Sequence, residues 1–354
     1  MKKTITLLFL ALIVVACKEA PKVNTIQTLE LVDLLNGTPK TATMNDVFSD
    51  VKKIPLETSE EILIGHMSSV TPYKDYLIVG HDGICSLFDK DGRYIRQIGS
   101  KGQGPDEYVS ISNIAVEDDL IRIYSTLKIL SFTFEGKPVS HFKTPSLRDA
   151  IGLADKNLYV GYIPNISGQE DNKLLFFNDE GEEVGTFPYY EKYENPTGII
   201  TVMYDECSLF RSEDKLYMKE LMNDTIFAIN ADKTLTPCYA LSLGTQGAEP
   251  ALRYQMTSLA DTPTKGKARF NLLGAFGQQS LFLTSGYQLI TWNKETSKIA
   301  RQQIQFSKED QELFDKEFFT PNSMTPDGKT IISWQSLADI DNDDNPIVIL
   351  ATLK

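Results

Sequence analysis

The chain has 354 residues and the composition of a globular protein, with 42% hydrophobic and 23% charged residues. Its 48 acidic residues outnumber the 35 basic ones, and a surface with a net charge of −13 repels the phosphates of a nucleic acid. No basic run offsets this charge, so we exclude a nucleic-acid partner. A chain of this length buries an ample core, in one large β domain or in several smaller ones, without disulfides or structural metals.

The first sixteen residues have the pattern of a secretory signal. Two lysines precede the apolar run 5–15, which is shorter than the roughly 20 residues needed to cross a bilayer. The run ends in the sequence VVAC at 14–17, which resembles the lipoprotein box: a small Ala16 suits the signal peptidase, and the thiol of Cys17 accepts a diacylglycerol. An ordinary signal with a chance cysteine is the alternative. We expect cleavage before Cys17 and a lipid that holds the mature chain to a membrane.

The sequence divides into three segments. Residues 1–16 are the expected signal peptide, and residues 17–50 contain few large aromatic side chains. We expect 17–50 to form a lipidated tether. The remainder, 51–354, carries a regular repeat of strand and turn patterns and is expected to form the folded domain.

Three cysteines remain beyond Cys17, namely Cys85, Cys207 and Cys238. An odd number without CxxC spacing gives neither a disulfide framework nor a zinc site. Cys85 lies in an apolar, strand-like run and is expected to be a small buried hydrophobic residue. One disulfide between two of the three stays an open alternative in an oxidising compartment.

A polar turn followed by an apolar strand recurs six times along the chain, at intervals of 38 to 65 residues. A strand–turn–strand element rich in Asp, Asn and Gly follows each of the first five copies, most clearly at 87–95. Such turns favour hairpins because these residues tolerate positive φ. Four short strands per unit, repeated six times, predict an all-β six-bladed β-propeller whose small sheets bury their faces against each other. The six apolar strands contain Leu77, Leu120, Leu158, Leu216, Leu281 and Ile331.

The last repeat lacks an outer strand. Its own strands are expected at about 330–335 and 346–353, where the chain ends. The spare segment 51–57 near the N-terminus is available to complete this blade. We therefore expect an N-terminal strand to close the last blade and to leave no open edge in the ring.

Two segments interrupt the strand pattern. Residues 249–260 carry apolar side chains at helical spacing, and residues 307–318 begin with Ser307, a candidate N-cap. We expect two short helical insertions between blades, on one rim of the disc.

Several segments match a known family. They are the lipoprotein box and the stretches 54–58, 88–99, 102–108 and 344–349. Together they resemble the six-bladed β-propeller lipoproteins of Bacteroides-like bacteria, which are related to NHL-repeat propellers, over about residues 45–354. The resemblance implies a six-bladed fold and an extracytoplasmic, outer-membrane location on the periplasmic or the surface face. It implies no activity, because the family has no assigned catalytic residues.

Two loops resemble ligand motifs without meeting their requirements. The glycine-rich segment 99–105 lacks the Gly-Lys-Ser/Thr ending and the following helix of a phosphate-binding loop, so we expect a crossover between blades, with a ligand-contacting rim loop as the alternative. The acidic segment 339–344 alternates carboxylates as a calcium loop does. Its sixth position is Asp344 instead of Gly and its twelfth is Leu350 instead of Glu. We expect a solvated acidic loop, with weak calcium binding as the alternative, and no other cofactor.

No catalytic or metal-binding set is recognisable in the sequence. The three histidines, His66, His81 and His141, have no paired spacing, and no Gly-x-Ser-x-Gly motif is present. Serines are abundant, but a Ser-His-Asp set cannot be assembled from sequence order alone.

The central channel is the expected ligand site, because the innermost strands of all blades meet there. The polar residues in the strands before the six apolar ones mix acids, bases and amides, which favours a polar binding funnel over a metal site. A shift of one residue turns each side chain away from the channel, and pinning of the channel mouth is the alternative role. The candidate ligand-binding residues are His66, Asn113, Arg148, Glu206, Arg269 and Asn322.

These patterns favour a non-catalytic binding or scaffold protein of the cell envelope, with a glycan, a peptide or a partner protein as its ligand. The competing hypothesis is an NHL-like propeller hydrolase or lyase with a channel-bound divalent cation. A structural subunit of an envelope complex is a third. The sequence leaves the ligand, the membrane face and the oligomeric state open.

Overall fold

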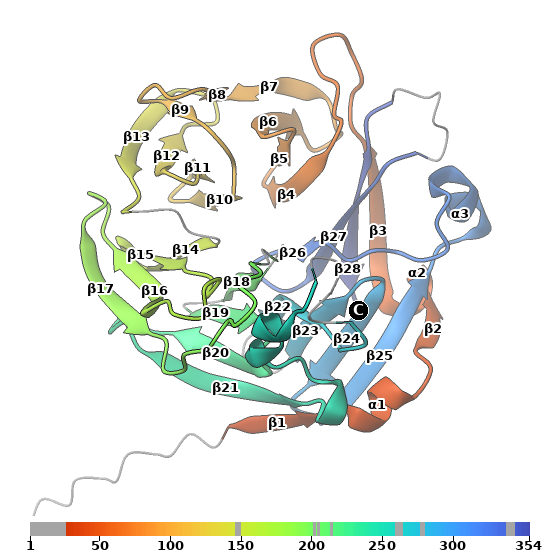
Figure 1. The fold of residues 1–354 in the computed structure, drawn as a ribbon. Helices are drawn as coiled ribbons and strands as arrows, with labels where there is room; N and C mark the ends of the chain where they lie inside the picture. The colour runs from red at the N-terminus through yellow and green to blue at the C-terminus, as the bar shows by residue number, and fades with distance from the viewer. Residues whose placement is uncertain are drawn as a thin grey trace, which may run out of the picture.

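Six antiparallel sheets follow one another along the chain and lie around a common centre in the computed structural model (Figure 1). The structure describes residues 26–145, 150–200, 203, 206–212, 215–258, 265–276, 280–337 and 344–354. The first strands of neighbouring blades, such as β18 and β22, contact each other, so the first strand of a blade is its innermost. The predicted six-bladed β-propeller is confirmed.

Each blade has four antiparallel strands, which follow one another from the centre outward. Blade 1 contains β4 (Met67–Tyr73), β5 (Tyr76–His81), β6 (Ile84–Asp89) and β7 (Tyr94–Ile98), and blade 2 contains β10 (Asn113–Glu117), β11 (Leu120–Tyr124), β12 (Lys128–Phe132) and β13 (Pro138–Lys143). Blade 3 contains β14 (Ile151–Asp155), β15 (Leu158–Tyr162), β16 (Asn172–Phe177) and β17 (Glu183–Pro188), and blade 4 contains β18 (Cys207–Ser212), β19 (Lys215–Glu220), β20 (Thr225–Ile229) and β21 (Leu235–Ser242). Blade 5 contains β22 (Asn271–Phe276), β23 (Ser280–Ser285), β24 (Gln288–Asn293) and β25 (Lys298–Gln305), and blade 6 contains β26 (Ser323–Met324), β27 (Thr330–Gln335), β28 (Ile347–Leu353) and β3 (Phe48–Pro55).

The six apolar strands predicted from the repeat are the second strands of the six blades. The polar turns before them use positive φ, as at Lys74 (53°), Asp119 (58°) and Asn157 (56°). In the outer hairpin of blade 1, Gly92 has φ 86°, and a Cβ there would lie 2.1 Å from the carbonyl oxygen of Pro55. Turn chemistry and close approach together require glycine at this position.

The core is divided among the blade interfaces. In the described residues, one cluster of buried apolar side chains lies at each of the six interfaces between neighbouring blades. In β5, Leu77 and Val79 pack toward blade 6, while Ile78 packs toward blade 2. Successive side chains of a strand point to opposite faces, and both faces are covered in this arrangement. The second strands are therefore mostly apolar.

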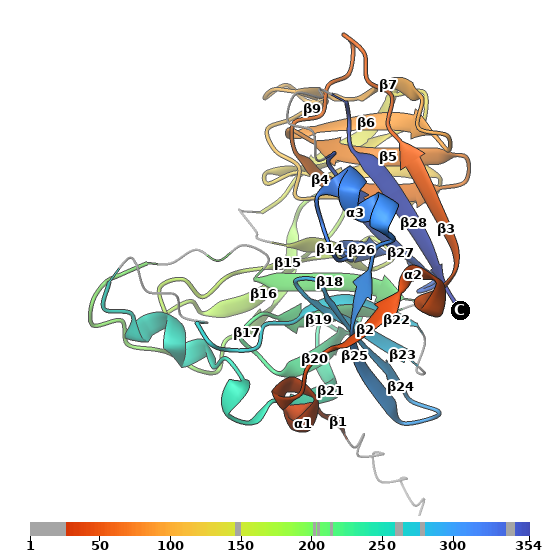
Figure 2. The ribbon, with the colours of Figure 1, turned by 90° about the vertical axis from the view of Figure 1, so that its right-hand side faces the viewer.

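An N-terminal strand closes the ring as predicted. The strand β3 pairs antiparallel with β28, from Pro55 opposite Ile347 to Phe48 opposite Leu353, and the two lie side by side in Figure 2. Asn345, which is 3% exposed, fastens the closure with four hydrogen bonds. Its Nδ2 donates to the carbonyls of residues 57 (2.6 Å) and 62 (3.0 Å), its Oδ1 accepts from the amide of residue 64 (2.7 Å), and its amide donates to the hydroxyl of residue 58 (2.7 Å).

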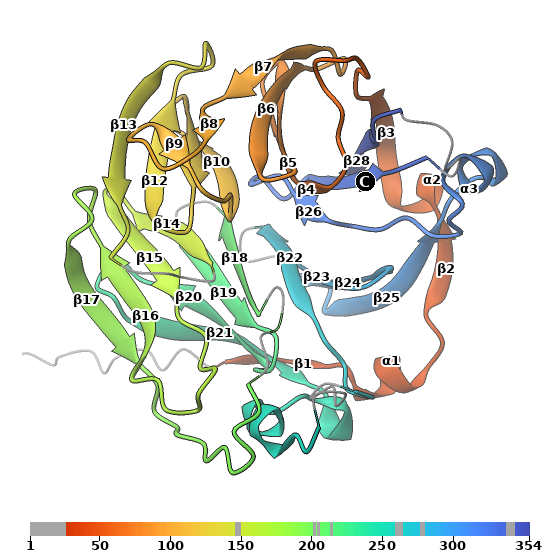
Figure 3. The ribbon, with the colours of Figure 1, turned by 45° about the horizontal axis from the view of Figure 1, so that its top comes forward.

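Residues 27–47, which we expected within the tether 17–50, pack on the propeller. The strand β1 (Gln27–Glu30) pairs parallel with β21, and β2 (Lys40–Thr43) pairs parallel with β25, so this segment runs along the outer edges of blades 4 and 5 before it enters blade 6 (Figure 3). Leu29 and Leu31 are 1% and 0% exposed, and their burial offsets the cost of ordering the segment. We call residues 27–47 the N-terminal strap.

Helices are few and short. The strap contains α1 (Val32–Asn36) and α2 (Met44–Val47). The expected insertion at 307–318 forms α3 (Lys308–Phe314), and the hydroxyl of Ser307 accepts from the amide of Asp310 at 3.1 Å, as an N-cap does. The expected insertion at 249–260 begins with a 3₁₀ helix, Pro250–Gln255, that follows a 3₁₀ turn at Gly244–Gln246.

Candidate functional site

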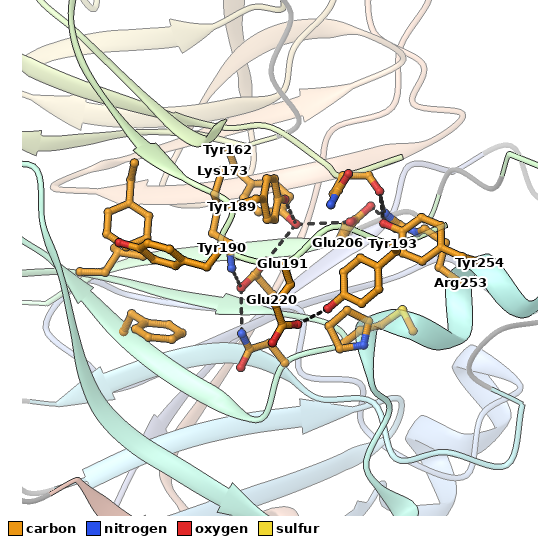
Figure 4. Close-up of a pocket in the computed structure, with 17 residues that line it drawn as sticks. Tyr162, Lys173, Tyr189, Tyr190, Glu191, Tyr193, Glu206, Glu220, Arg253 and Tyr254 are labelled. Atoms are coloured by element: carbon orange, nitrogen blue, oxygen red, sulfur yellow. Dashed lines mark hydrogen bonds and ion pairs between the residues drawn. The ribbon is translucent and has the colours of Figure 1, made fainter. Parts of the chain in front are cut away.

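A cavity of about 320 Å³ lies between blades 3 and 4. The ends of β15 and β19, the start of β16, the link after β17 and the 3₁₀ helix Pro250–Gln255 bring side chains to it, as Figure 4 shows. Its size falls near the lower end of the range of about 300–1,000 Å³ for small-molecule pockets. The lining residues are Tyr162, Asn165, Lys173, Phe187, Tyr189, Tyr190, Glu191, Tyr193, Glu206, Glu220, Met222, Asn223, Phe227, Leu235, Pro250, Arg253 and Tyr254.

The first charged pair in the cavity joins blades 3 and 4. Lys173 Nζ donates to Glu220 Oε2 at 2.7 Å, and Asn223 Nδ2 donates to the same oxygen at 3.1 Å. The ammonium group also lies 5.1 Å from the centre of the Tyr189 ring, a cation–π contact. The side chains of Lys173 and Glu220 are 15% and 10% exposed, so both charges are largely shielded from water.

The second charged pair joins blade 4 to the 3₁₀ helix. Arg253 Nη2 lies 2.5 Å from Glu206 Oε2, and these side chains are 4% and 8% exposed. Arg253 Nη1 donates to the carbonyl of Asn165 at 3.2 Å, and the Tyr254 hydroxyl donates to the same carbonyl. Burial alone would lower the pKa of Arg253, but its contact with Glu206, together with the nearby Tyr254 and Tyr162, raises that pKa above its usual value. The guanidinium is therefore a fixed positive charge.

Tyr162 connects the two pairs. Its hydroxyl lies 3.3 Å from Glu206 Oε1 and 3.2 Å from Glu220 Oε1, so one proton serves two carboxylates. The hydroxyl of Tyr189 donates to the carbonyl of Ile163 at 2.7 Å. Burial raises the pKa of both Tyr162 and Tyr189, and the nearby Glu220 raises it further. Both phenols therefore stay protonated and act as donors.

Aromatic rings flank the charged groups. Tyr193 and Tyr254 stack with ring centres 4.9 Å apart and planes at 15°, and Phe187 meets Tyr190 edge-on at 5.7 Å. Tyr190 is 80% exposed. In Figure 4, Tyr190 lies on the opposite side of the paired charges from Tyr193 and Tyr254. The cavity thus combines apolar ring faces with a polar floor.

Two buried donors at the cavity have no hydrogen-bond partner. They are Arg253 Nε and Asn165 Nδ2. Both residues are at least 95% buried, and both line the cavity. Both atoms are themselves buried, so they belong to the polar layer beneath the cavity and are not exposed to it.

The candidate channel residues fall in different places. Glu206 lines the cavity, immediately before β18. His66, Asn113, Arg269 and Asn322 are exposed at or just before innermost strands and are not among the lining residues. The remaining candidate, Arg148, and the expected lipidation site, Cys17, lie outside the described residues. The channel site therefore stays a prediction.

Sequence reasoning missed the other functional candidates of the cavity. Tyr162, Lys173, Glu220 and Arg253 come from four separate elements and share no spacing. The signal that could have found the cavity is the sequence YYEKY at 189–193, because three tyrosines in a polar link between blades have no core to enter.

A Ser-His-Asp set does exist in the fold, in the hairpin between β5 and β6. His81 Nε2 lies 2.8 Å from Ser86 Oγ, and His81 Nδ1 lies 3.1 Å from Asp82 Oδ2. Ser86 is 0% exposed and His81 is 1% exposed, so no substrate reaches the hydroxyl. Asp82 also accepts from the amides of Gly65 and His66, each at 2.9 Å. The set fastens a hairpin to the link before blade 1.

The other sequence motifs give no second site. Segment 99–105 belongs to the crossover from blade 1 to blade 2, where β8 (Ser100–Lys101) pairs with β9 (Glu107–Tyr108). The acidic residues 339–343 lie outside the described residues. Among the residues that the structure describes, no group of three or more His, Cys, Asp or Glu side chains is placed to share a metal ion. Cys85, Cys207 and Cys238 are reduced in the structure.

No helix in the described part of the chain has the length and hydrophobicity to cross a membrane. This finding concerns helices only.

Comparisons with other proteins address the fold and the family. The profile of a family described as "Domain of unknown function (DUF4934)" matches residues 27–352. A protein of Bacteroides fragilis described as exported has a similar structure, with a TM-score of 0.59 and 13% identity over 93% of this chain and 100% of its own. No curated protein matches the sequence.

Two further solved structures are more distant. A member of the DUF4221 family from Bacteroides vulgatus has a TM-score of 0.47 and 11% identity, over 86% of this chain and 96% of its own. The virginiamycin B lyase of Staphylococcus aureus has a TM-score of 0.46 and 12% identity, over 86% of this chain and 99% of its own.

Proposed function

The chain belongs to the DUF4934 family of domains of unknown function, and from this premise we propose that it is an extracytoplasmic binding protein. Its ligand occupies the cavity between blades 3 and 4. A lipid on Cys17 anchors the protein to the outer membrane. The ligand is a small molecule or the end of a larger one, in keeping with a cavity of about 320 Å³.

The observation that carries the proposal is the fixed polar floor of the cavity. Two ion pairs, Lys173–Glu220 and Arg253–Glu206, hold each other in position through the hydroxyl of Tyr162. Such a network keeps its shape without a ligand, so little ordering is left to be done on binding.

Binding without chemistry fits this floor better than catalysis. Both carboxylates are already engaged by a cation and share the Tyr162 hydroxyl. A general acid or base needs a carboxyl group within reach of the substrate proton, and these oxygens are turned to their partners. The proposed role is therefore recognition.

The proposed location draws on the N-terminal sequence. A signal-like run ending in Cys17 precedes the fold, and nine residues separate this cysteine from the first strand of the strap. The B. fragilis structural relative is described as exported. To test the anchor, cells are labelled with radioactive palmitate: the wild-type chain is expected to carry label, and Cys17→Ala to carry none. Equal labelling of both chains would overturn the lipid anchor.

A thermal-shift experiment tests the cavity. The purified protein is heated with a mixture of soluble oligosaccharides and short peptides, and we expect its melting temperature to rise because a ligand stabilises the state it binds. Tyr190→Ala removes an 80% exposed ring at the cavity and should reduce the rise. Tyr287→Ala, at a 48% exposed ring in blade 5, is the matched control. An equal rise in all three proteins would place the ligand elsewhere, and no rise in any would refute the proposal.

A further inference from the structure

The cavity floor presents hydrogen-bond donors and acceptors side by side. The Lys173 ammonium and the Asn223 amide both donate to Glu220 Oε2, at 2.7 and 3.1 Å. A hydroxyl group is one donor and two acceptors, so it can accept from the ammonium or the amide while it donates to the carboxylate. Lys173, Glu220 and Asn223 thus form a row of donors and acceptors. Two adjacent hydroxyl groups on one ring can hydrogen-bond to this row at the same time. A neutral amide also offers a donor and an acceptor, so this row by itself does not distinguish a sugar from a peptide.

The rings flanking the floor provide flat apolar faces. Tyr190 is 80% exposed and is supported edge-on by Phe187, while the stacked pair Tyr193–Tyr254 lies on the other side of the charges. A sugar ring has the complementary shape: its axial C–H groups form an apolar face, and its hydroxyl groups surround the edge. The negative face of a tyrosine ring attracts such C–H groups.

Charge disfavours an ionised ligand. The cavity holds Glu191, Glu206 and Glu220 against Lys173 and Arg253, a formal excess of one negative charge that repels an acidic ligand. A basic ligand finds Glu206 and Glu220 already paired with Arg253 and Lys173, so only Glu191, which accepts from the Tyr193 hydroxyl, is left to pair with it. Displacing Lys173 or Arg253 from its carboxylate would leave a charge buried without a partner. A neutral ligand leaves both ion pairs intact.

A purely apolar ligand is disfavoured as well. It would cover the row formed by Lys173, Glu220 and Asn223 without hydrogen-bonding to it, which costs these groups their hydration. The hydroxyl groups of a sugar replace the hydrogen bonds to water that this row loses.

We propose that the cavity binds a neutral saccharide unit, whose hydroxyl groups meet Lys173, Glu220 and Asn223 and whose ring packs on Tyr190. This inference rests on the proposed binding function and gives it a ligand class. The unit is a single compact part of a glycan, because the cavity has the size of a small-molecule site.

Calorimetric titration of the purified protein tests the inference. The probes are three separate panels: neutral oligosaccharides of glucose, galactose, mannose and N-acetylhexosamines, oligosaccharides of uronic acids, and short uncharged peptides. We expect a neutral oligosaccharide to bind, and Tyr190→Ala to weaken it by about tenfold, the loss of one aromatic contact. Tyr287→Ala should bind as the wild type does.

Each other outcome has its own meaning. Preference for uronic acid oligosaccharides would overturn the neutral ligand. Binding of peptides alone, lost in Tyr190→Ala, would overturn the saccharide and leave the binding function standing. Binding of a neutral oligosaccharide that Tyr190→Ala leaves unchanged would remove the saccharide from this cavity. If no probe in any of the three panels binds, both the saccharide and the binding function are refuted.

Discussion

Two polar clusters of this propeller look alike chemically and differ in access. In blade 1, His81 joins Ser86 and Asp82 in the arrangement of a catalytic set, yet Ser86 and His81 are 0% and 1% exposed. Between blades 3 and 4, the charges of Glu206 and Glu220 border an open cavity. Side-chain identity alone would favour the first cluster, and burial favours the second.

Hydrogen bonding separates the two clusters further. Both ring nitrogens of His81 have partners, so the set in blade 1 is complete without a ligand. The cavity is instead lined by Lys173, Glu220 and Asn223, which keep unused donors and acceptors for a ligand. A complete buried network contributes to stability, whereas an incomplete one beside a cavity marks a binding site. Variants in each cluster can test this division.

The largest effect is expected at His81. His81→Leu leaves the buried Ser86 hydroxyl without a partner, and we expect the free energy of unfolding to fall by about 2–3 kcal/mol in urea titrations. Adding Ser86→Ala should recover part of the loss, because the unpaired group is then gone. Saccharide binding should not change once the protein is folded. Wild-type stability in His81→Leu combined with lost binding would reverse the roles of the clusters.

A smaller loss of stability is expected in the cavity, with a larger loss of binding. Tyr162→Phe removes the hydroxyl between Glu206 and Glu220, which should lower the unfolding free energy by about 1 kcal/mol and weaken saccharide binding several-fold. Tyr124→Phe is the matched control, since its buried hydroxyl donates to Glu117 away from the cavity. Calorimetry should show unchanged binding in the control. Equal binding losses in both variants would indicate a general loosening of the fold.

The free energy of unfolding at acid pH should show the role of Asp82. Burial alone would raise its pKa, but hydrogen bonds from His81 and from the amides of Gly65 and His66 lower it below 3.8. A folded pKa below the unfolded value stabilises the protein above pH 3.8, and this contribution is lost as the pH falls through the folded pKa. Asp82→Asn should therefore flatten the acid limb of a plot of unfolding free energy against pH. A limb as steep as that of the wild type would remove Asp82 from the blade 1 network.

The smallest effect is expected from calcium. If the cavity binds a neutral ligand and neither cluster needs a cation, millimolar calcium should move the melting temperature by less than about 1 °C, and a chelator should have no effect. A calcium-dependent rise would favour the competing enzyme hypothesis, with a divalent cation in the channel or in the acidic segment 339–344.

Local patterns were sufficient to predict most of the fold. Leu77 and its five counterparts mark the second strands, because a strand covered on both faces is mostly apolar. The missing outer strand of blade 6 pointed to residues 51–57, and β3 spans Phe48–Pro55. Ser307 was recognised as an N-cap because its hydroxyl acts within one turn.

Two features were not predicted from local patterns. The strap was expected within a tether because β1 and β2 are four-residue strands that pair in parallel with partners some two hundred residues away or more. A short parallel edge strand has neither a turn nor a long alternation to mark it. The cavity was missed for a similar reason, since Tyr162 and Arg253 meet only when two blades and a link are assembled.

The sequence by itself determined the repeat, the number of blades and the closing strand, because periodicity and turn residues act over short distances along the chain. Tertiary structure alone decided which polar residues are reachable. It buried Ser86 and His81 between blades and opened a cavity beside Glu206 and Glu220, because exposure depends on how neighbouring sheets pack. The candidate function of this protein therefore depends on which polar residues the packing of the blades leaves exposed.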